Sequence, residues 1–143
     1  MTGIVESRIS DFLKEHHVLT LATSSGNQPW CANCFYTWLE EEAAFVFTSD
    51  HDTKHIQDLS EGNRVAGSVV LETETVGKIR GVQFTGRLYE PGNPLKKKAK
   101  KEYLKRFPYA VLMKTRLWIL EVDYFKMTDN RLGFGKKLIW ERK

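Results

Sequence analysis

The sequence predicts an α+β fold in which a small, mainly antiparallel β-barrel is flanked by about three helices. Several short segments rich in β-branched and aromatic residues alternate in polarity and are separated by turn signals, which indicates antiparallel strands joined by hairpins. Three further segments carry apolar residues at helical spacing. At 143 residues the chain is long enough for one core, so residues 1–143 are interpreted as a single domain.

The first half of the chain predicts an amphipathic helix followed by a three-stranded meander. Residues 4–16 place Ile9 and Leu13 on one helical face. The strands are expected at 17–23, 29–39 and 43–48. Gly26 and Asn27 suit the tip of the first hairpin. Both faces of the second strand contain large apolar residues, so we expect both faces to be covered.

The second half predicts two more helices and the strands that complete the barrel. The expected elements are a helix at 53–61, strands at 64–71, 116–126 and 132–141, and a long extended segment at 75–90. Within that segment Gly81 and Gly86 indicate bulges or a sharp bend. Asn93 and Pro94 are expected to open the third helix as its cap and first residue. One buried stripe follows at Leu95, Ala99, Tyr103 and Phe107.

Composition and charge narrow the class of protein. The formal net charge is +4, and five lysines fall within residues 96–101, so the positive charge is local. No basic start precedes a long apolar run, which predicts no secretory signal, and no run reaches the roughly 20 apolar residues of a transmembrane helix. We therefore expect a cytoplasmic protein with reduced cysteines.

The junction at residues 43–62 is the first candidate site, because a strand there runs into the start of a helix. Thr48, Ser49 and Thr53 supply hydroxyls and Lys54 supplies a cation, while Asp52 is expected to cap the helix. Unpaired amides at a helix start attract anions, so this junction could hold a phosphate. The alternative is an ordinary strand–helix turn with a polar rim.

Five separated segments, in order along the chain, resemble one known group of proteins. They are WCAN (30–33), FVFTSDHDTKH (45–55), IRGVQFTG (79–86), RFP (106–108) and MTDNRLGFGKKLIW (127–140). Together with NRVAGSVV after the predicted second helix, they resemble the pyridoxamine 5′-phosphate oxidase-like, FMN-binding split-barrel superfamily, and within it the small uncharacterised YhbP-like branch. The resemblance implies a split barrel that forms a homodimer, with FMN at the subunit interface.

The resemblance also implies which residues contact the flavin. Residues at the positions of Thr48, Thr53 and Lys54 hold the phosphate in the wider superfamily. Local chemistry adds Ser49 and His55 as neighbours.

For the isoalloxazine ring, the resemblance implies the strand segment from Asn33 to Phe35. A late aromatic residue, for which Trp140 is the candidate, is expected nearby. Gln83 is a further candidate, although the position of the superfamily glutamine falls nearer Gly81. The oxidase holds the flavin phosphate with several basic residues, whereas here Lys54 stands nearly alone, and the chain lacks the oxidase's Arg-rich closing motif. Oxidation of pyridoxamine phosphate is therefore not predicted.

Two other patterns favour ordinary structural interpretations. Cys31 and Cys34 have C-x-x-C spacing, but in a strand they point to opposite faces, so two separate buried thiols are expected. His51 and His55 lie four apart without a continuous helix beneath them, so no metal site is predicted.

The sequence leaves three functions open. The first is a flavin-dependent oxidoreductase of unknown substrate, in which FMN carries the redox chemistry. The second is a non-catalytic flavin or haem binder, such as a sensor or carrier. The third is a nucleic-acid-binding module that uses the Lys96–Lys101 helix, which is less favoured because no aromatic residues are interleaved with the lysines.

Overall fold

The computed structural model describes residues 4–143, which form an α+β split barrel as the sequence predicts. One antiparallel sheet has the strand order β3-β2-β1-β4-β5-β6-β7, and β3 also pairs with β6, which closes six strands into a barrel. The strands are β1 (Val18–Ser25), β2 (Gln28–Leu39), β3 (Ala44–Ser49), β4 (Arg64–Val70), β5 (Arg80–Tyr89), β6 (Arg116–Asp129) and β7 (Lys137–Glu141). The α-helices are α1 (Ser7–Glu15), α2 (Lys54–Gln57) and α3 (Leu95–Arg106).

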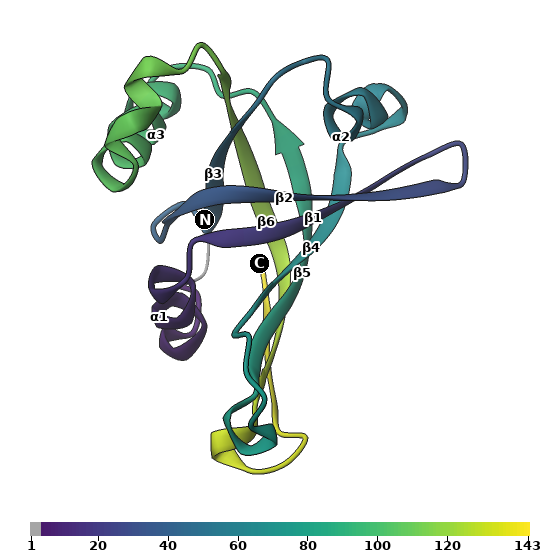
Figure 1. The fold of residues 1–143 in the computed structure, drawn as a ribbon, viewed down its shortest axis with the longest axis vertical. Helices are drawn as coiled ribbons and strands as arrows, with labels where there is room; N and C mark the ends of the chain where they lie inside the picture. The colour runs from purple at the N-terminus through teal and green to yellow at the C-terminus, as the bar shows by residue number, and fades with distance from the viewer. Residues whose placement is uncertain (1–3) are drawn as a thin grey trace.

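Four short 3-10 helices complete the chain. They are η1 (Asp58–Glu61), η2 (Val76–Lys78), η3 (Pro108–Leu112) and η4 (Asn130–Leu132). The β1–β2 hairpin projects sideways from the barrel. The long strands β5 and β6, with the short strand β7 beside β6, extend downward to a tip formed by η2 and η4 (Figure 1). Helices α1 and α3 lie on one side of the barrel and α2 on the other (Figure 1).

The core fills the barrel with aromatic and branched side chains from the inward positions of the strands. Phe45 is central: its ring lies 4.8 Å from Phe84 and 5.0 Å from Tyr36, measured between centroids. A second cluster covers the outer face of β3, where Val46 and Ile119 pack against Tyr103 of α3. Strand β3 is thus buried on both faces, and α3 is fixed to the barrel by the predicted apolar stripe.

A bulge in β5 confirms one of the two predicted glycine irregularities. The register with β6 shifts between Thr85 and Gly86. A Cβ on Gly86 would collide with the carbonyl oxygen of Glu121 and lie 2.8 Å from a methyl carbon of Leu120. Gly86 therefore permits the close approach of two strands. Gly81 sits in regular pairing with Val70 and Thr128.

Several boundaries differ from the predictions for local reasons. The predicted second helix is one turn, Lys54–Gln57, followed by the 3-10 turn η1, and Asp52 is exposed and does not cap it; the cap position is Thr53. Asn93 does not cap α3, because Pro94 takes the cap position. The last strand starts at Lys137, since residues before it form η4 and a turn.

The expectation that both faces of β2 are covered is wrong for its first half. Residues 28–33 are exposed or only partly buried, and the side chains of Trp30 and Phe35 are 47% and 61% exposed. The core begins at Cys34 on the inner face of β2, and both faces are buried only from Tyr36 onward. Within residues 4–143, no helix is both long and apolar enough to cross a membrane.

Candidate functional site

The barrel opens where β3 separates from β2. Their last paired residues are Tyr36 and Phe47, beyond which β3 stays with β6 as far as Ser49, whereas β2 continues with β1 as far as Gln28. In the part of the chain that the structure describes, no strand pairs with residues 28–35 on the β3 side. We call this the open β2 edge. It presents main-chain donors and acceptors that need partners.

Helix α3 borders one end of the open β2 edge. The Tyr103 hydroxyl donates to the Phe35 carbonyl oxygen at 3.4 Å, and the ring of Phe107 lies 5.7 Å from that of Phe35. Arg106 donates to the Tyr36 carbonyl oxygen at 3.1 Å and stacks over the Tyr36 ring at 5.3 Å. The same guanidinium also donates to the carbonyl oxygens of Lys14 and His16. Arg106 therefore ties α1, β2 and α3 together beside the opening.

Helix α2 borders the other end, and its lysine is already paired. The Lys54 ammonium lies 2.8 Å from Asp58 Oδ1 and 5.7 Å from the ring centre of Trp30. Asp58 Oδ2 accepts a hydrogen bond from Thr23 at 2.8 Å. Donation from Lys54 and then from Thr23 holds the pKa of Asp58 below its ordinary value. Sequence reasoning missed Asp58, although its i,i+4 spacing from Lys54 was a usable signal.

Ser49 at the end of β3 and His55 of α2 form a buried pair. Ser49 Oγ lies 2.7 Å from His55 Nε2, and the Thr53 hydroxyl donates to the Asp50 carbonyl oxygen at 2.8 Å. Burial lowers the pKa of His55, which favours its neutral form. The structure thus uses Ser49 and His55 for an internal contact, whereas Thr53 is partly exposed and Lys54 lies at the surface beside Trp30.

Asn33 and Gln83 lie on one transverse row across the outer face of the sheet. Successive register partners are Asn33, Thr20, Ser68, Gln83 and Lys126, from β2 through β1, β4 and β5 to β6. Thr20 donates to Asn33 Oδ1 at 2.8 Å. An open groove of about 370 Å³ runs along the part of this row from β1 to β6. Two predicted flavin contacts, distant in sequence, therefore share one face.

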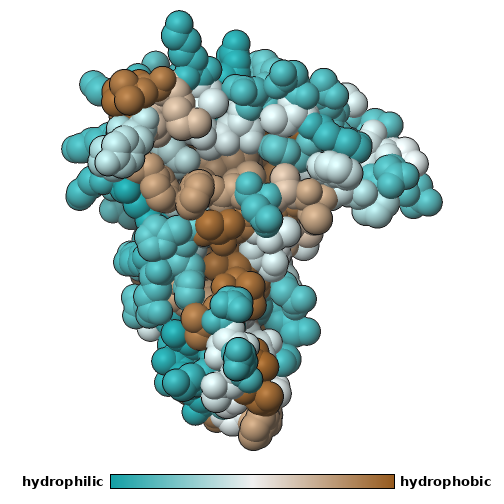
Figure 2. Space-filling view, viewed as in Figure 1, coloured by the Kyte–Doolittle hydropathy of each residue, from teal (hydrophilic) through white to brown (hydrophobic). Residues whose placement is uncertain are grey.

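Exposed apolar side chains surround this row. Val18 and Phe35 are register partners on the outer face, and Val70 lies two residues beyond Ser68. Figure 2 shows apolar surface running from the crossing of β1 and β2 down toward the lower ends of the long strands. The face is therefore flat, partly apolar and open to solvent in this chain.

Trp140 does not reach outward. Its side chain is buried in the core beside Phe125, at 5.9 Å between ring centroids, and its indole nitrogen donates to the Ile4 carbonyl oxygen at 3.1 Å. Trp140 pairs with Phe125 across β7 and β6, and this register directs its side chain inward. Its role as a flavin contact stays a prediction, which this inward position does not favour.

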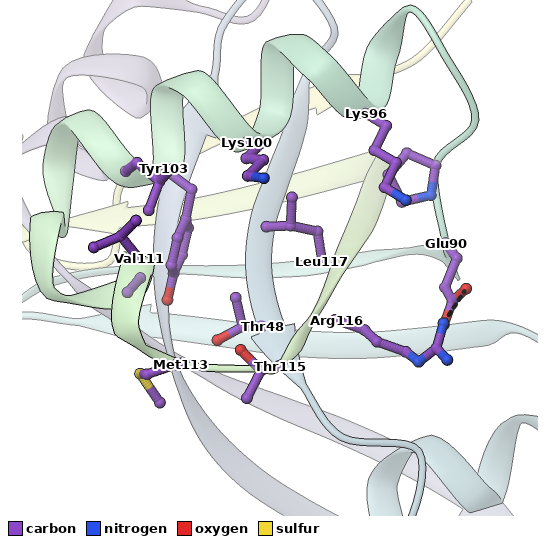
Figure 3. Close-up of a pocket in the computed structure, with 13 residues that line it drawn as sticks. Thr48, Glu90, Lys96, Lys100, Tyr103, Val111, Met113, Thr115, Arg116 and Leu117 are labelled. Atoms are coloured by element: carbon purple, nitrogen blue, oxygen red, sulfur yellow. Dashed lines mark ion pairs between the residues drawn. The ribbon is translucent and has the colours of Figure 1, made fainter.

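Thr48 faces a separate cavity under α3, which we call the α3 pocket. Because neighbouring strand residues alternate, Thr48 points away from Ser49. The cavity is about 280 Å³ in volume. Its polar and charged lining is Thr48, Glu90, Lys96, Lys100, Tyr103, Thr115 and Arg116, and its apolar wall includes Leu104, Val111, Met113 and Leu117 (Figure 3). The sequence analysis did not predict this pocket, because its lining brings β3 together with α3, η3 and β6, which are distant from β3 in the chain.

The two cysteines and His51 do not form a redox pair or a metal site. Cys34 is buried, which raises the pKa of its thiol to about 11, whereas Cys31 is exposed, so the expectation of two buried thiols is wrong for Cys31. Both are free thiols. His51 lies outside α2 and hydrogen-bonds Glu90. Among residues 4–143, no group of three or more His, Cys, Asp or Glu side chains is arranged to hold a metal ion.

The fold assigns the chain to the α+β split barrels, and solved structures share that architecture. An FAD-binding protein from Mesorhizobium loti superposes with a TM-score of 0.70 at 15% identity, covering 89% of this chain and 95% of that one. The haem storage protein HutZ from Vibrio cholerae gives a TM-score of 0.68 at 14% identity, covering 98% and 96%.

Sequence comparison gives the family. No established family profile matches the chain. However, it is 40% identical over 134 residues to the UPF0306 protein of Photorhabdus laumondii, covering 94% of each chain. The chain belongs to the UPF0306 family.

Proposed function

We propose that this protein binds FMN along the open β2 edge and acts as a homodimer in which the partner subunit covers the flavin. The observation that carries the proposal is the separation of β3 from β2 after Tyr36 and Phe47. It leaves an unpaired strand edge between two helices, beside an exposed face of mixed apolar and polar character. The likeness of the fold to an FAD-binding protein and to a haem storage protein supports a planar cofactor.

The dimensions and chemistry of the open edge suit an elongated ligand with a flat ring and a charged tail. From Trp30 to Phe35 an extended strand spans about 17 Å. Main-chain groups beside Asn33 would pair with the polar edge of the isoalloxazine, and the exposed Phe35 side chain would border the ring. Thr53 and Lys54 would hold the phosphate at the α2 end. The bound flavin would supply redox chemistry, and these residues would fix its orientation.

The exposed sheet face supports the homodimer. Val18, Phe35, Val70 and Ile139 are 43%, 61%, 66% and 52% exposed, and the groove beside Gln83 is open. Contiguous apolar surface of this kind is typical of an interface. A second copy over this face would remove it from water and exclude solvent from the flavin ring.

Haem binding is the second candidate, and one residue favours it. Cys31 is exposed and lies two residues from Asn33 on the same face of β2, where its thiolate would be able to serve as an axial ligand. In either case, catalysis is a separate question, because a bound cofactor does not by itself identify a substrate.

An absorption spectrum of freshly purified protein tests the cofactor. We expect the bands of an oxidised flavin; a Soret band instead would favour haem, and a Cys31→Ala variant would then change it. Size-exclusion chromatography with light scattering should give a dimer, and a monomer that retains FMN would contradict the interface site. Turnover of reduced nicotinamide nucleotide by the flavin-loaded protein would support an oxidoreductase, and its absence with all acceptors would favour a carrier or sensor.

A further inference from the structure

The α3 pocket has the features of a binding site in its own right. It lies between α3, η3, the end of β3 and the start of β6, and all of its lining comes from one chain. At about 280 Å³ it is at the lower limit of ligand cavities, which suits a small molecule and is too small for a dinucleotide.

The charges around the pocket are unbalanced. Lys96 and Lys100 lie one helical turn apart on the side of α3 that lines the cavity, and Arg116 enters from β6. Glu90 is the acidic residue of the lining; it hydrogen-bonds His51 and lies 3.9 Å from the Arg116 guanidinium. That separation exceeds a hydrogen bond, so Arg116 keeps donors available.

The two helix lysines differ from their neighbour on the same helix. Lys98 is 2.9 Å from Glu41 and 2.8 Å from Glu42, so its charge is neutralised. Lys96 and Lys100 have no ion-pair partner in residues 4–143. Two like charges at i,i+4 repel each other, and an anion between them would relieve that repulsion.

Hydroxyl groups line the floor of the pocket opposite the lysines. Thr48 and Tyr103 both line the cavity, and the Tyr103 hydroxyl donates to the Phe35 carbonyl oxygen. Figure 3 shows the hydroxyls of Thr48, Tyr103 and Thr115 on one side of the cavity, with Val111 and Met113 beside them. Cations, hydroxyls and apolar groups together select an anionic head group on an apolar body.

We propose that the α3 pocket binds a small organic anion, a carboxylate or phosphate monoester that carries a compact apolar or aromatic group. Lys100 and Arg116 bind the anionic group, and Leu104, Val111 and Met113 contact the apolar part. The pocket does not depend on a flavin, since no residue of the open β2 edge contributes to its lining. Tyr103 connects the two regions, because its ring lines the pocket and its hydroxyl contacts Phe35 at that edge.

Titration with phenyl phosphate tests this proposal on the protein as purified, at constant ionic strength, with amide NMR shifts as the readout. We expect the largest shifts at residues 115–117 and in α3. Lys100→Gln and Arg116→Gln should each raise the Kd about tenfold or more. Lys101→Gln is the matched control, since Lys101 is exposed on the same helix but does not line the pocket; its Kd should not change.

The class of ligand is tested by related probes. Benzoate should bind at the same residues, whereas the neutral benzyl alcohol should bind at least tenfold more weakly because it lacks the charge. Equal affinity for all variants, equal affinity for the neutral probe, or shifts that map away from α3 would each overturn the proposal. Flavin content, read from the visible spectrum, should be the same in all four proteins, which separates this test from that of the cofactor.

Discussion

Lys54 Nζ lies 2.8 Å from Asp58 Oδ1, so the cation expected at the flavin phosphate is already bound to a carboxylate. An ammonium group has three donors and can contact both groups. Asp58 nevertheless places a negative charge beside a dianion, which weakens phosphate binding. Substitutions of Lys54 and of Asp58 should therefore change the affinity for FMN in opposite directions.

Lys54→Gln should weaken FMN binding by about 1.5–3 kcal/mol, because a charge-assisted contact to the phosphate is lost. Asp58→Asn should strengthen it, because the repulsive charge is removed while the hydrogen-bonding shape is kept. Fluorescence titration of apoprotein with FMN measures both. Lys97→Gln, an exposed lysine on α3 that does not line the α3 pocket, is the control. An unchanged Kd for Lys54→Gln would remove Lys54 from the site.

The buried Ser49–His55 pair predicts a loss of stability in mild acid. Burial lowers the pKa of His55 in the folded state, so the unfolded chain binds the proton first as the pH falls. The stabilising contribution is complete above the ordinary histidine value of 6.5 and is lost as pH falls from there through the folded pKa. The free energy of unfolding of wild type and of His55→Gln is measured with urea at several pH values in this range. It should depend less steeply on pH in the variant.

His16 should contribute to the same pH dependence of stability, because burial also lowers its pKa. The double variant His16→Gln/His55→Gln should flatten the profile more than either single change. Parallel curves for wild type and His55→Gln would mean that His55 is protonated equally in the folded and unfolded states.

Arg106 is expected to be important for stability. Arg106→Ala removes a charged donor from the carbonyl oxygens of Tyr36, Lys14 and His16, and we expect a loss of roughly 2–3 kcal/mol in the free energy of unfolding. Arg106→Lys should recover little of this, because one ammonium cannot match the guanidinium fork. Lys105→Ala, at the exposed neighbouring position, should change stability by under about 0.5 kcal/mol. An equal loss of unfolding free energy in Arg106→Ala and Lys105→Ala would contradict the view that Arg106 holds α1, β2 and α3 together.

The close approach at Gly86 makes a further prediction. Gly86→Ala should cost about 1–3 kcal/mol, because the new methyl group would meet the Glu121 carbonyl and Leu120. Gly77→Ala is the matched control, since a Cβ there has no neighbour within 4 Å. Chemical denaturation of both variants is sufficient, and equal midpoints would show that the two strands can separate at the bulge without cost.

Much of the fold was predictable because the signals are local. Alternation defined the strands, Gly26 and Asn27 marked a hairpin that the structure forms with both residues at positive φ, and helical spacing gave the buried faces of α1 and α3. The one-turn helix after β3 was overestimated, since apolar spacing at Ile56 and Leu59 does not distinguish an α-helix from a 3-10 turn.

The candidate site was less predictable because its residues meet through pairing between distant strands. The hydroxyl-rich segment at the end of β3 was identified, yet Thr48 and Ser49 point to opposite sides, one into the α3 pocket and the other toward His55. The i,i+4 spacing of Lys54 and Asp58 indicates an ion pair. The hydrogen bond from Thr23 of β1 to Asp58 could not be predicted from that spacing. Trp140 was a candidate flavin contact near the end of the sequence. Only the pairing of β7 with β6, which places Trp140 opposite Phe125, shows that its side chain lies in the core.

The sequence alone determined the class of fold, most of the strands and helices, and the segment where a phosphate-binding cation would lie. Each of these depends on residues that are close together in the chain. Tertiary structure alone decided where the barrel opens, which side chains share the outer face with Asn33, and which lysines of α3 face a cavity. Those features depend on strand register and on packing between distant segments, such as those of Phe45 and Phe125, which are 80 residues apart.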